Sequence, residues 1–299
     1  MRPVGGPRKT VKGQDNDDAG FAEVGTRPCT LSVVVPTRNE ALNVGPLAAR
    51  LQAALSGTVG GWELIFVDDS DDNTPEVVRR LADAVGVGSP VRLLHRQRGV
   101  RSGGLGGAVR DGFDIARGRV LAVMDADLQH PPEVLPALIA PVLSGEADLV
   151  AGSRYGWAGA DAGLSSPWRH LVSGGCRWLV HLSVPSSRPL QDPLSGLFAL
   201  RRSLLDDVQL RPAGYKILLE VTVRARPATV ANMGFNFAPR HAGRSKASLR
   251  EGLVFMRHLA RLVSMSLRKR ADRPEWPAAV ELDAVDLRGK QLLEPVEKR

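Results

Sequence analysis

Two aspartates, one residue apart, follow an apolar run in VLAVMDADLQHPP (residues 120–132). The run predicts a buried strand, and in an open α/β sheet ligands bind beyond the carboxyl ends of the strands. Asp125, Asp127 and the amide of Gln129 carry the oxygen donors that Mg²⁺ or Mn²⁺ prefers beside substrate phosphates. The two prolines end the strand, and His130 is expected near the surface. A solvated loop is the alternative for an isolated Asp-x-Asp.

Other apolar runs with polar ends accompany this one. LSVVVP (31–36) is followed by Thr-Arg-Asn-Glu, and WELIFV (62–67) by a group of aspartates. VRLLHR (91–96) and DLVAGSRY (148–155) are two further strands, the latter with Arg154 near its end. Segments of helical spacing separate the strands, so the pattern predicts an α/β domain with a mainly parallel sheet and helices on both faces.

Composition limits the possible functions. The chain has 299 residues, which favours one large α/β domain, and its formal charge of +8 predicts an anionic partner. Cys29 and Cys176 lie far apart, which indicates a reducing compartment and neither a disulfide framework nor a zinc site. No apolar run reaches the roughly 18 residues of a membrane-spanning helix, so we expect a soluble or surface-bound protein. Aromatic residues are few and no nucleic-acid motif occurs, which argues against a nucleic-acid partner.

A basic, glycine-rich turn in RQRGVRSGGLGGAVRDGF (96–113) leads into a predicted helix. Val109 stands where a dinucleotide-binding motif needs its last glycine, and no Walker lysine follows. The glycines therefore either cradle a phosphate or allow close packing of the helix on the sheet.

The ends of the chain differ from its centre. Residues 1–28 are expected to be disordered, 29–248 to form the domain, and 271–299 to be a mobile tail. Residues 163–185 and 249–270 have amphipathic, basic patterns that fit either a helix on a membrane surface or a helix docked on the domain with a solvated edge. A short strand is expected near FNFAPR, which begins at Phe235.

Eight motifs in this order, VVVPTRNE, VDDSDDNT, GGLGGAVRDGF, MDADLQHPPE, AGSRY, DPLSGLFAL, GYKILLE and FAPRHAGRSK, resemble a family 2 glycosyltransferase of GT-A fold. They are similar in particular to the polyprenol (dolichol) phosphate mannosyltransferases, over about residues 30–250. This resemblance implies transfer of mannose from GDP-mannose to a polyprenyl monophosphate, with inversion at C1 and a divalent cation. It also implies a peripheral protein on the cytoplasmic face of a membrane, and a membrane-embedded partner subunit is one possibility.

The resemblance also implies roles for individual residues. The nucleotide pocket would be formed by Pro36, Arg38, Glu40, Val67, Asp69 and Ala126. The metal would be held by Asp125, Asp127 and Gln129. The donor diphosphate and the acceptor phosphate would be contacted by Arg154, Arg169, Arg240 and Lys246. Asp192, in DPLSG, would lie beside the acceptor; a turn cap is its alternative role. Because a phosphate acceptor is already ionised at neutral pH, the reaction needs no strong general base, and Asp192 is at most a weak candidate for one.

The chain departs from the family pattern at two places. Arg38 stands where an aromatic or small residue is common, and Arg244 in GRSKAS replaces a glutamate. Base recognition and the acceptor side could therefore differ. The alternatives are a UDP-glucose or other nucleotide-sugar transferase acting on the same lipid, and a non-catalytic protein that binds a membrane surface or nucleic acid.

Overall fold

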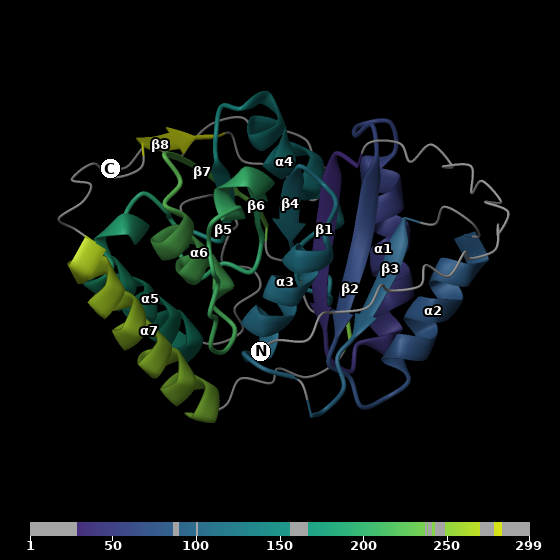
Figure 1. Ribbon diagram of the computed structural model, residues 1–299, viewed down its shortest axis with the longest axis horizontal. Coiled ribbons are helices and arrows are strands. Elements are labelled where there is room, and N and C mark those ends of the chain that lie inside the picture. The colour runs from purple at the N-terminus through teal and green to yellow at the C-terminus, as the bar shows by residue number, and fades with distance from the viewer. Residues whose placement is uncertain are drawn as a thin grey trace, which may run out of the picture.

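The computed structural model describes residues 29–85, 90–99, 101–155, 167–236, 238, 241–242, 249–269 and 278–282. The expected disorder of residues 1–28 falls outside this part of the chain. The described residues form one eight-stranded sheet of order β3-β2-β1-β4-β6-β5-β7-β8 (Figure 1). The strands are β1 (Leu31–Thr37), β2 (Trp62–Asp68), β3 (Val91–His95), β4 (Val120–Val123), β5 (Leu149–Ser153), β6 (Phe198–Arg201), β7 (Thr229–Gly234) and β8 (Ala278–Glu281).

The prediction of a mainly parallel sheet is confirmed. β6 is antiparallel to both of its neighbours, β4 and β5, and the other paired strands are parallel. β1 pairs with β2 on one side and with β4 on the other, and Thr37 faces Asp68 in this register. The ends of three strands that lead into acidic or polar turns therefore meet at one edge of the sheet.

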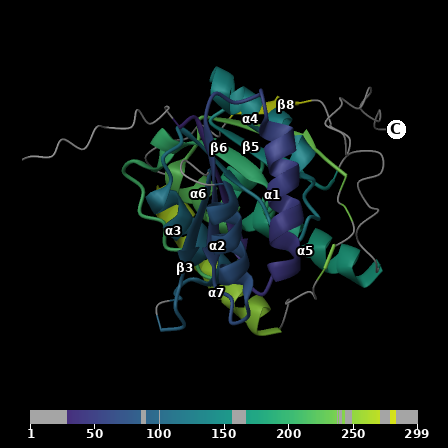
Figure 2. The ribbon, with the colours of Figure 1, turned by 90° about the vertical axis from the view of Figure 1, so that its right-hand side faces the viewer.

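Helices cover both faces of the sheet, as expected. The helices are α1 (Ala41–Leu55), α2 (Thr74–Val85), α3 (Gly104–Ile115), α4 (Leu135–Ser144), α5 (Pro167–Ser183), α6 (Ile217–Ala225) and α7 (Leu249–Lys269). One face packs on α1, α2 and α4 through side chains such as Val33, Leu47 and Leu138, and the other packs on α3 and α6 through side chains such as Ile65 and Phe113. Figure 2 shows α1 and α3 on opposite sides of the sheet.

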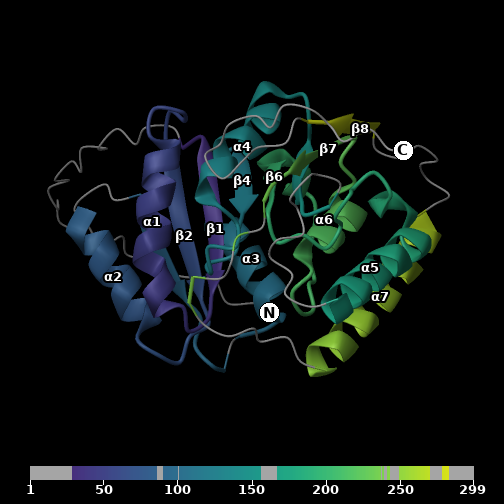
Figure 3. The same cartoon turned by 180° about the vertical axis from the view of Figure 1, so that it is seen from behind.

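A third apolar cluster lies outside α6, where α5 and α7 run side by side (Figures 1 and 3). Its buried members include Val180, Leu219, Phe255, Leu259 and Leu262. Both amphipathic segments are therefore docked helices in this structure. No helix among the described residues combines the length and the apolar character that crossing a bilayer requires.

The short strand expected near FNFAPR is β7, which ends at Gly234, the residue before this motif. Another expectation about the C-terminal third was wrong. Residues 271–299 were expected to be a mobile tail, yet Ala278–Glu281 form β8 and pair with β7. A four-residue strand is too short to be distinguished by periodicity, and its pairing covers the outer edge of β7.

Candidate active site

A cavity of about 330 Å³ lies where β1, β2 and β4 end. Asp69 follows β2, while Asp125 and Asp127 follow β4, and all three carboxylates line this cavity. The other residues that line it are Pro36, Thr37, Arg38, Glu40, Gly104, Leu105, Ala108, Ala126, Gly214 and Tyr215. The structure therefore brings together most of the residues predicted for the nucleotide pocket and two of the three predicted metal ligands.

The turn after β4 is fixed by its own backbone. Leu128 is buried and has a φ of +63°, a left-handed conformation that a bulky side chain rarely adopts. The amide of Gln129 donates to Asp127 Oδ1 at 3.1 Å, and the backbone amide of His241 donates to the Asp127 carbonyl at 3.2 Å. Ala238 N donates to the Gln129 carbonyl at 3.0 Å. Two residues from beyond β7 thus help to hold the acids in place.

His130 is buried, with only 2% of its surface exposed, so the expectation that it lies near the surface was wrong. Its Nδ1 accepts a hydrogen bond from the backbone amide of Asp125 at 3.2 Å, and its ring contacts Phe235 edge-on with centroids 5.5 Å apart. Burial lowers the pKa of His130, with the charges of Asp125 and Asp127 acting in the opposite direction. A neutral imidazole that orients the first aspartate is the result, and the polar, proline-flanked sequence gave no sign of it.

Asp69 is held by Arg96, a residue that the sequence analysis did not single out. Arg96 donates to both carboxylate oxygens of Asp69, at 2.8 and 2.5 Å, and to Asp111 Oδ2 at 3.0 Å. It also donates to the carbonyls of Ser102 and Gly104 at 3.2 and 3.1 Å. Burial lowers the pKa of Arg96, but Asp69 and Asp111 outweigh it and raise the net value. Arg96 therefore joins an acid of the cavity to the glycine-rich turn.

The glycines of that turn serve packing. A Cβ on Gly107 would lie 1.8 Å from the Ser102 carbonyl oxygen, and a Cβ on Gly106 would lie 2.8 Å from Pro212 Cβ. Gly106 N donates to the Gly214 carbonyl at 2.7 Å. Close approach between backbones explains the glycine content, which supports the packing alternative; the start of α3 still forms one wall of the cavity.

Arg154 and Asp192 form a buried ion pair, with 2.8 Å between Nε and Oδ2 and only 1% of the Asp192 side chain exposed. The other oxygen of Asp192 accepts from Leu194 N at 3.3 Å. Burial lowers the pKa of Arg154, but the charge and hydrogen bond of Asp192, together with the charges of Tyr155 and Asp125, raise it above the ordinary value, so the guanidinium stays protonated. Asp192 caps its own turn and holds Arg154, which leaves it poorly suited to act as a base.

The remaining predicted residues have different positions. Val67 is fully buried, and its side chain lies against Gly112 of α3. Because side chains alternate between the two faces of a strand, Val67 faces the core under α3 and does not form part of the cavity wall. Gln129 Nε2 donates to the Ala238 carbonyl at 3.4 Å. Arg169 lies in α5. Arg240 and Lys246 lie outside the described residues.

The donor set of the cavity fits a hard divalent cation. Asp125 and Asp127 supply carboxylates, the turn between them is fixed, and Gln129 adds an amide oxygen nearby in the chain. Among the described residues, no group of three or more His, Cys, Asp or Glu side chains is arranged to hold a metal. A cation here would need further oxygens from a ligand, as Mg²⁺ and Mn²⁺ sites that share a substrate diphosphate do.

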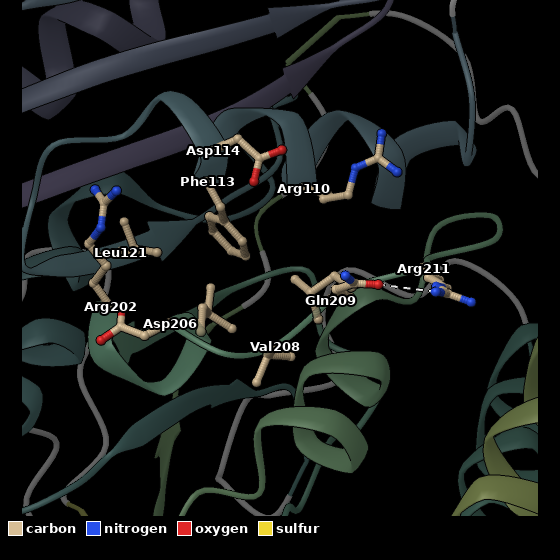
Figure 4. A pocket seen from close by; sticks show the side chains of 11 residues that line it. Arg110, Phe113, Asp114, Leu121, Arg202, Asp206, Val208, Gln209 and Arg211 are labelled. Carbon is tan, nitrogen blue, oxygen red and sulfur yellow. Dashed lines mark hydrogen bonds between the residues drawn. The ribbon is translucent and has the colours of Figure 1, made fainter.

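A second cavity, of about 610 Å³, lies beside α3 and the segment that follows β6 (Figure 4). Arg110 and Asp114 lie on its α3 side, Asp206 lies opposite, and Gln209 bonds Arg211 at 3.0 Å. No residue predicted for the active site lines it. Volume alone therefore does not select the candidate site, and the convergence of carboxylates at the sheet edge favours the smaller cavity.

Comparison with known proteins agrees with this geometry. The profile of glycosyl transferase family 2 matches residues 32–208. The chain is 38% identical over 237 residues to a dolichol-phosphate mannosyltransferase from Pyrococcus furiosus, an alignment that covers 78% of this chain and 63% of that relative. It is 31% identical over 280 residues to the polyprenol monophosphomannose synthase of Mycolicibacterium smegmatis, covering 88% and 97% of the two chains.

A solved structure has the same fold. The glucosyl-3-phosphoglycerate synthase from Mycobacterium tuberculosis, in complex with Mn²⁺, UDP and glucosyl-3-phosphoglycerate, superposes with a TM-score of 0.52 at 25% identity, over 83% of this chain and 81% of that one. The GT-A fold expected from the motifs is confirmed. With a matching profile over more than half of its length and acids gathered at the expected edge of the sheet, this chain belongs to glycosyl transferase family 2 and is a glycosyltransferase.

Proposed function

We propose that this enzyme transfers mannose from GDP-mannose to a polyprenyl monophosphate. The observation that carries the proposal is the cavity in which Asp69, Asp125 and Asp127 meet, in a chain whose relatives include a dolichol-phosphate mannosyltransferase and a polyprenol monophosphomannose synthase. Carboxylates at the β1 and β2 ends suit hydrogen bonds from the ribose and base, and the β4 acids suit a cation on the diphosphate.

In the proposed reaction an oxygen of the lipid phosphate attacks C1 of mannose from the side opposite the diphosphate. The new C1–O bond forms while the C1–O bond to GDP breaks, and GDP leaves with the electron pair, so the configuration at C1 inverts. No proton has to be removed from the ionised phosphate. Positioning and charge stabilisation supply most of the rate. A divalent cation held by Asp125, Asp127 and Gln129 would neutralise charge on the leaving diphosphate.

Arg154 suits the acceptor. It keeps its charge with Asp192 against it, and a guanidinium is suited to bidentate contacts with phosphate oxygens. Arg169, Arg240 and Lys246 are proposed to add further contacts to the two phosphate groups, as the family resemblance suggests.

The test is a transfer assay with GDP-mannose, Mg²⁺ or Mn²⁺ and a polyprenyl phosphate. Wild-type protein should form lipid-linked mannose, and Asp127→Ala should lower kcat by at least roughly 100-fold because the cation loses a direct ligand. Arg79→Ala, which removes an exposed side chain of α2, is the matched control and should be unchanged. Absence of transfer from any nucleotide sugar by the wild type would refute the proposal.

A UDP-sugar donor is the second candidate, favoured by the UDP in the similar glucosyl-3-phosphoglycerate synthase structure. Arg38, which lines the cavity, departs from the family pattern on the base side. Thermal-shift measurements with GDP or UDP and Mn²⁺ separate the two donors, since a ligand at about 100 times its Kd stabilises by about 2.7 kcal/mol. If UDP raises Tm more than GDP does, a UDP-sugar replaces GDP-mannose as the proposed donor.

We also propose that the outer sides of α5 and α7 lie on an anionic membrane, on its cytoplasmic face, with or without a membrane-embedded partner. Trp178, Leu182, Leu253 and Met256 are between 47% and 69% exposed on these helices. Exposed Arg257 adds charge that anionic lipids attract. Trp178→Ser with Leu253→Ser should lower binding to phosphatidylserine vesicles at least roughly 10-fold. Leu42→Ser, which replaces an equally exposed leucine on α1, should not; equal losses would contradict the proposed surface.

A further inference from the structure

The segment Asp192–Gly196 connects the two charged parts of the site. At its start Asp192 binds Arg154 at 2.8 Å. At its end Gly196 packs so closely on Asp125 that a Cβ there would lie 2.9 Å from the carboxylate oxygen. The path of this segment therefore sets the distance between Arg154 and Asp125.

A lysine of another element holds the middle of the segment. Lys216 Nζ donates to the carbonyl of Leu194 at 2.7 Å. Lys216 directly precedes α6, and its ammonium also lies 4.6 Å from the ring centroid of Tyr215, which lines the acid cavity. Among the described residues, no carboxylate lies within ion-pair distance of Nζ, so the carbonyl and the ring are what fix this cation.

The element that carries Lys216 is anchored independently. Glu220, in the first turn of α6, is fully buried and accepts a hydrogen bond from Arg211 N at 2.7 Å. Gly214, between these residues, accepts from Gly106 N at 2.7 Å. Lys216 thus projects from a fixed base toward the Leu194 carbonyl, and a fixed donor can determine where a loop lies.

We propose that Lys216 is a positioning residue of the transferase site: its ammonium holds the Asp192–Gly196 segment, and through it the spacing between Arg154 and Asp125. The catalytic part of this inference rests on the proposed function, while the effect on the segment does not. Residues that orient the groups in direct contact with a ligand typically change activity 10- to 100-fold when replaced.

The electrostatics of the position support this role. Burial and the charge of Arg154 lower the pKa of Lys216, whereas Asp192, Asp125 and Cys176 raise it, and the net pKa is about 8. The ammonium is therefore charged below a pH of about 8 and loses its proton above it. A neutral amine donates a weaker hydrogen bond to the Leu194 carbonyl, so the segment should loosen as the pH rises.

Two variants test the proposal in the full-length protein. Lys216→Met keeps most of the side-chain volume but removes the donor and the charge, and Lys216→Arg keeps both. Amide hydrogen exchange of Leu194 and Ser195, whose amides bond to Asp192, reports on the segment without any substrate. We expect exchange on the order of 10-fold faster in Lys216→Met and near the wild-type rate in Lys216→Arg. Arg79→Met is the control for loss of a cation.

The transfer assay gives the second measurement. Lys216→Met should lower kcat/KM for the lipid phosphate by roughly 10- to 100-fold, with the Kd for the nucleotide changed less than about threefold. Wild-type activity should fall as the pH rises through about 8, and Lys216→Arg should keep its activity there. Wild-type exchange in Lys216→Met, or the same alkaline fall in Lys216→Arg as in the wild type, would overturn the proposal. If the wild type transfers no sugar, the proposed function is refuted, and the hydrogen-exchange rates of Leu194 and Ser195 still decide whether Lys216 holds the segment.

Discussion

Removal of Arg96 should destabilise this structure and weaken its nucleotide pocket. Arg96 is 4% exposed and binds two carboxylates and two carbonyls. Arg96→Met leaves Asp69 and Asp111, only 13% and 23% exposed, without their shared cation. Breaking a buried ion pair from one side costs about 3–5 kcal/mol, and the partial exposure of both acids favours the lower end, about 3 kcal/mol.

That loss converts into a measurable shift. For a domain of this size each kcal/mol lowers Tm by about 2–4 °C, so we expect Arg96→Met to melt about 6–12 °C below the wild type. Arg98→Met is a matched control from the same segment, because Arg98 also pairs with an aspartate but is 78% exposed. An ion pair this exposed contributes little to stability, so the control should shift Tm far less than Arg96→Met does.

The same variant tests the link between Arg96 and the cavity. Asp69 lines the cavity and is oriented by Arg96, so Arg96→Met should also weaken nucleotide binding, measured by titration calorimetry at a temperature where the variant is folded. Arg96→Lys keeps the charge but cannot bind both oxygens of Asp69 as the planar guanidinium does. Its Tm and nucleotide affinity should therefore lie between those of the wild type and Arg96→Met. A variant as stable as Arg98→Met, with unchanged nucleotide affinity, would refute the reasoning.

Three further predictions concern the frame around the site. The side chain of Glu63 is 1% exposed and is hydrogen-bonded to Ser32, Arg92 and Arg117; burial raises its pKa, but these contacts outweigh burial and lower it. The ionised carboxylate therefore stabilises the fold above its unfolded pKa of about 4.3, and this stabilisation is lost as the pH falls through the folded pKa. The difference in Tm between the wild type and Glu63→Gln should narrow from pH 6 to pH 3. Gly107→Ala forces a Cβ against the Ser102 carbonyl and should lower Tm, whereas Gly174→Ala, with open space around it in α5, should raise stability by about 0.5–1 kcal/mol. His130→Phe keeps an aromatic ring against Phe235 but leaves Asp125 N without its acceptor, and should weaken Mn²⁺ binding by roughly tenfold in equilibrium dialysis while Tm falls only slightly.

The sequence carried enough information for the acid cavity because its signal is local. A buried strand is a short apolar run, and polar residues that follow it directly stand at its carboxyl end whatever the strand pairs with. Parallel strands place their carboxyl ends at the same edge of the sheet, so the edge could be predicted without the strand order. That Asp69 and Asp125 line one cavity depends on the order as well, because β2 and β4 both pair with β1.

The residues that orient these acids could not be predicted from the sequence, because their contacts are not local. Arg96 meets Asp69 and Asp111 across 27 and 15 positions, and Lys216 meets the Leu194 carbonyl across 22. No periodicity connects such pairs, because each depends on the order of strands and on the path of a loop. His130 shows the same limit: a polar residue before two prolines suggests a surface position, and the sequence does not show that the ring of Phe235, from beyond β7, packs against it.

The two amphipathic helices show a subtler limit. Their sequences fitted either a membrane surface or docking on the domain, and these two interpretations were treated as exclusive. In α7 the stripe is wide enough for both, because Phe255, Leu259 and Leu262 are buried against α5 and α6 while Leu253 and Met256 stay exposed. At 3.6 residues per turn these two sets point in different directions from one axis. Which part of a wide stripe is covered depends on the neighbouring helix, and that neighbour is fixed by the tertiary fold.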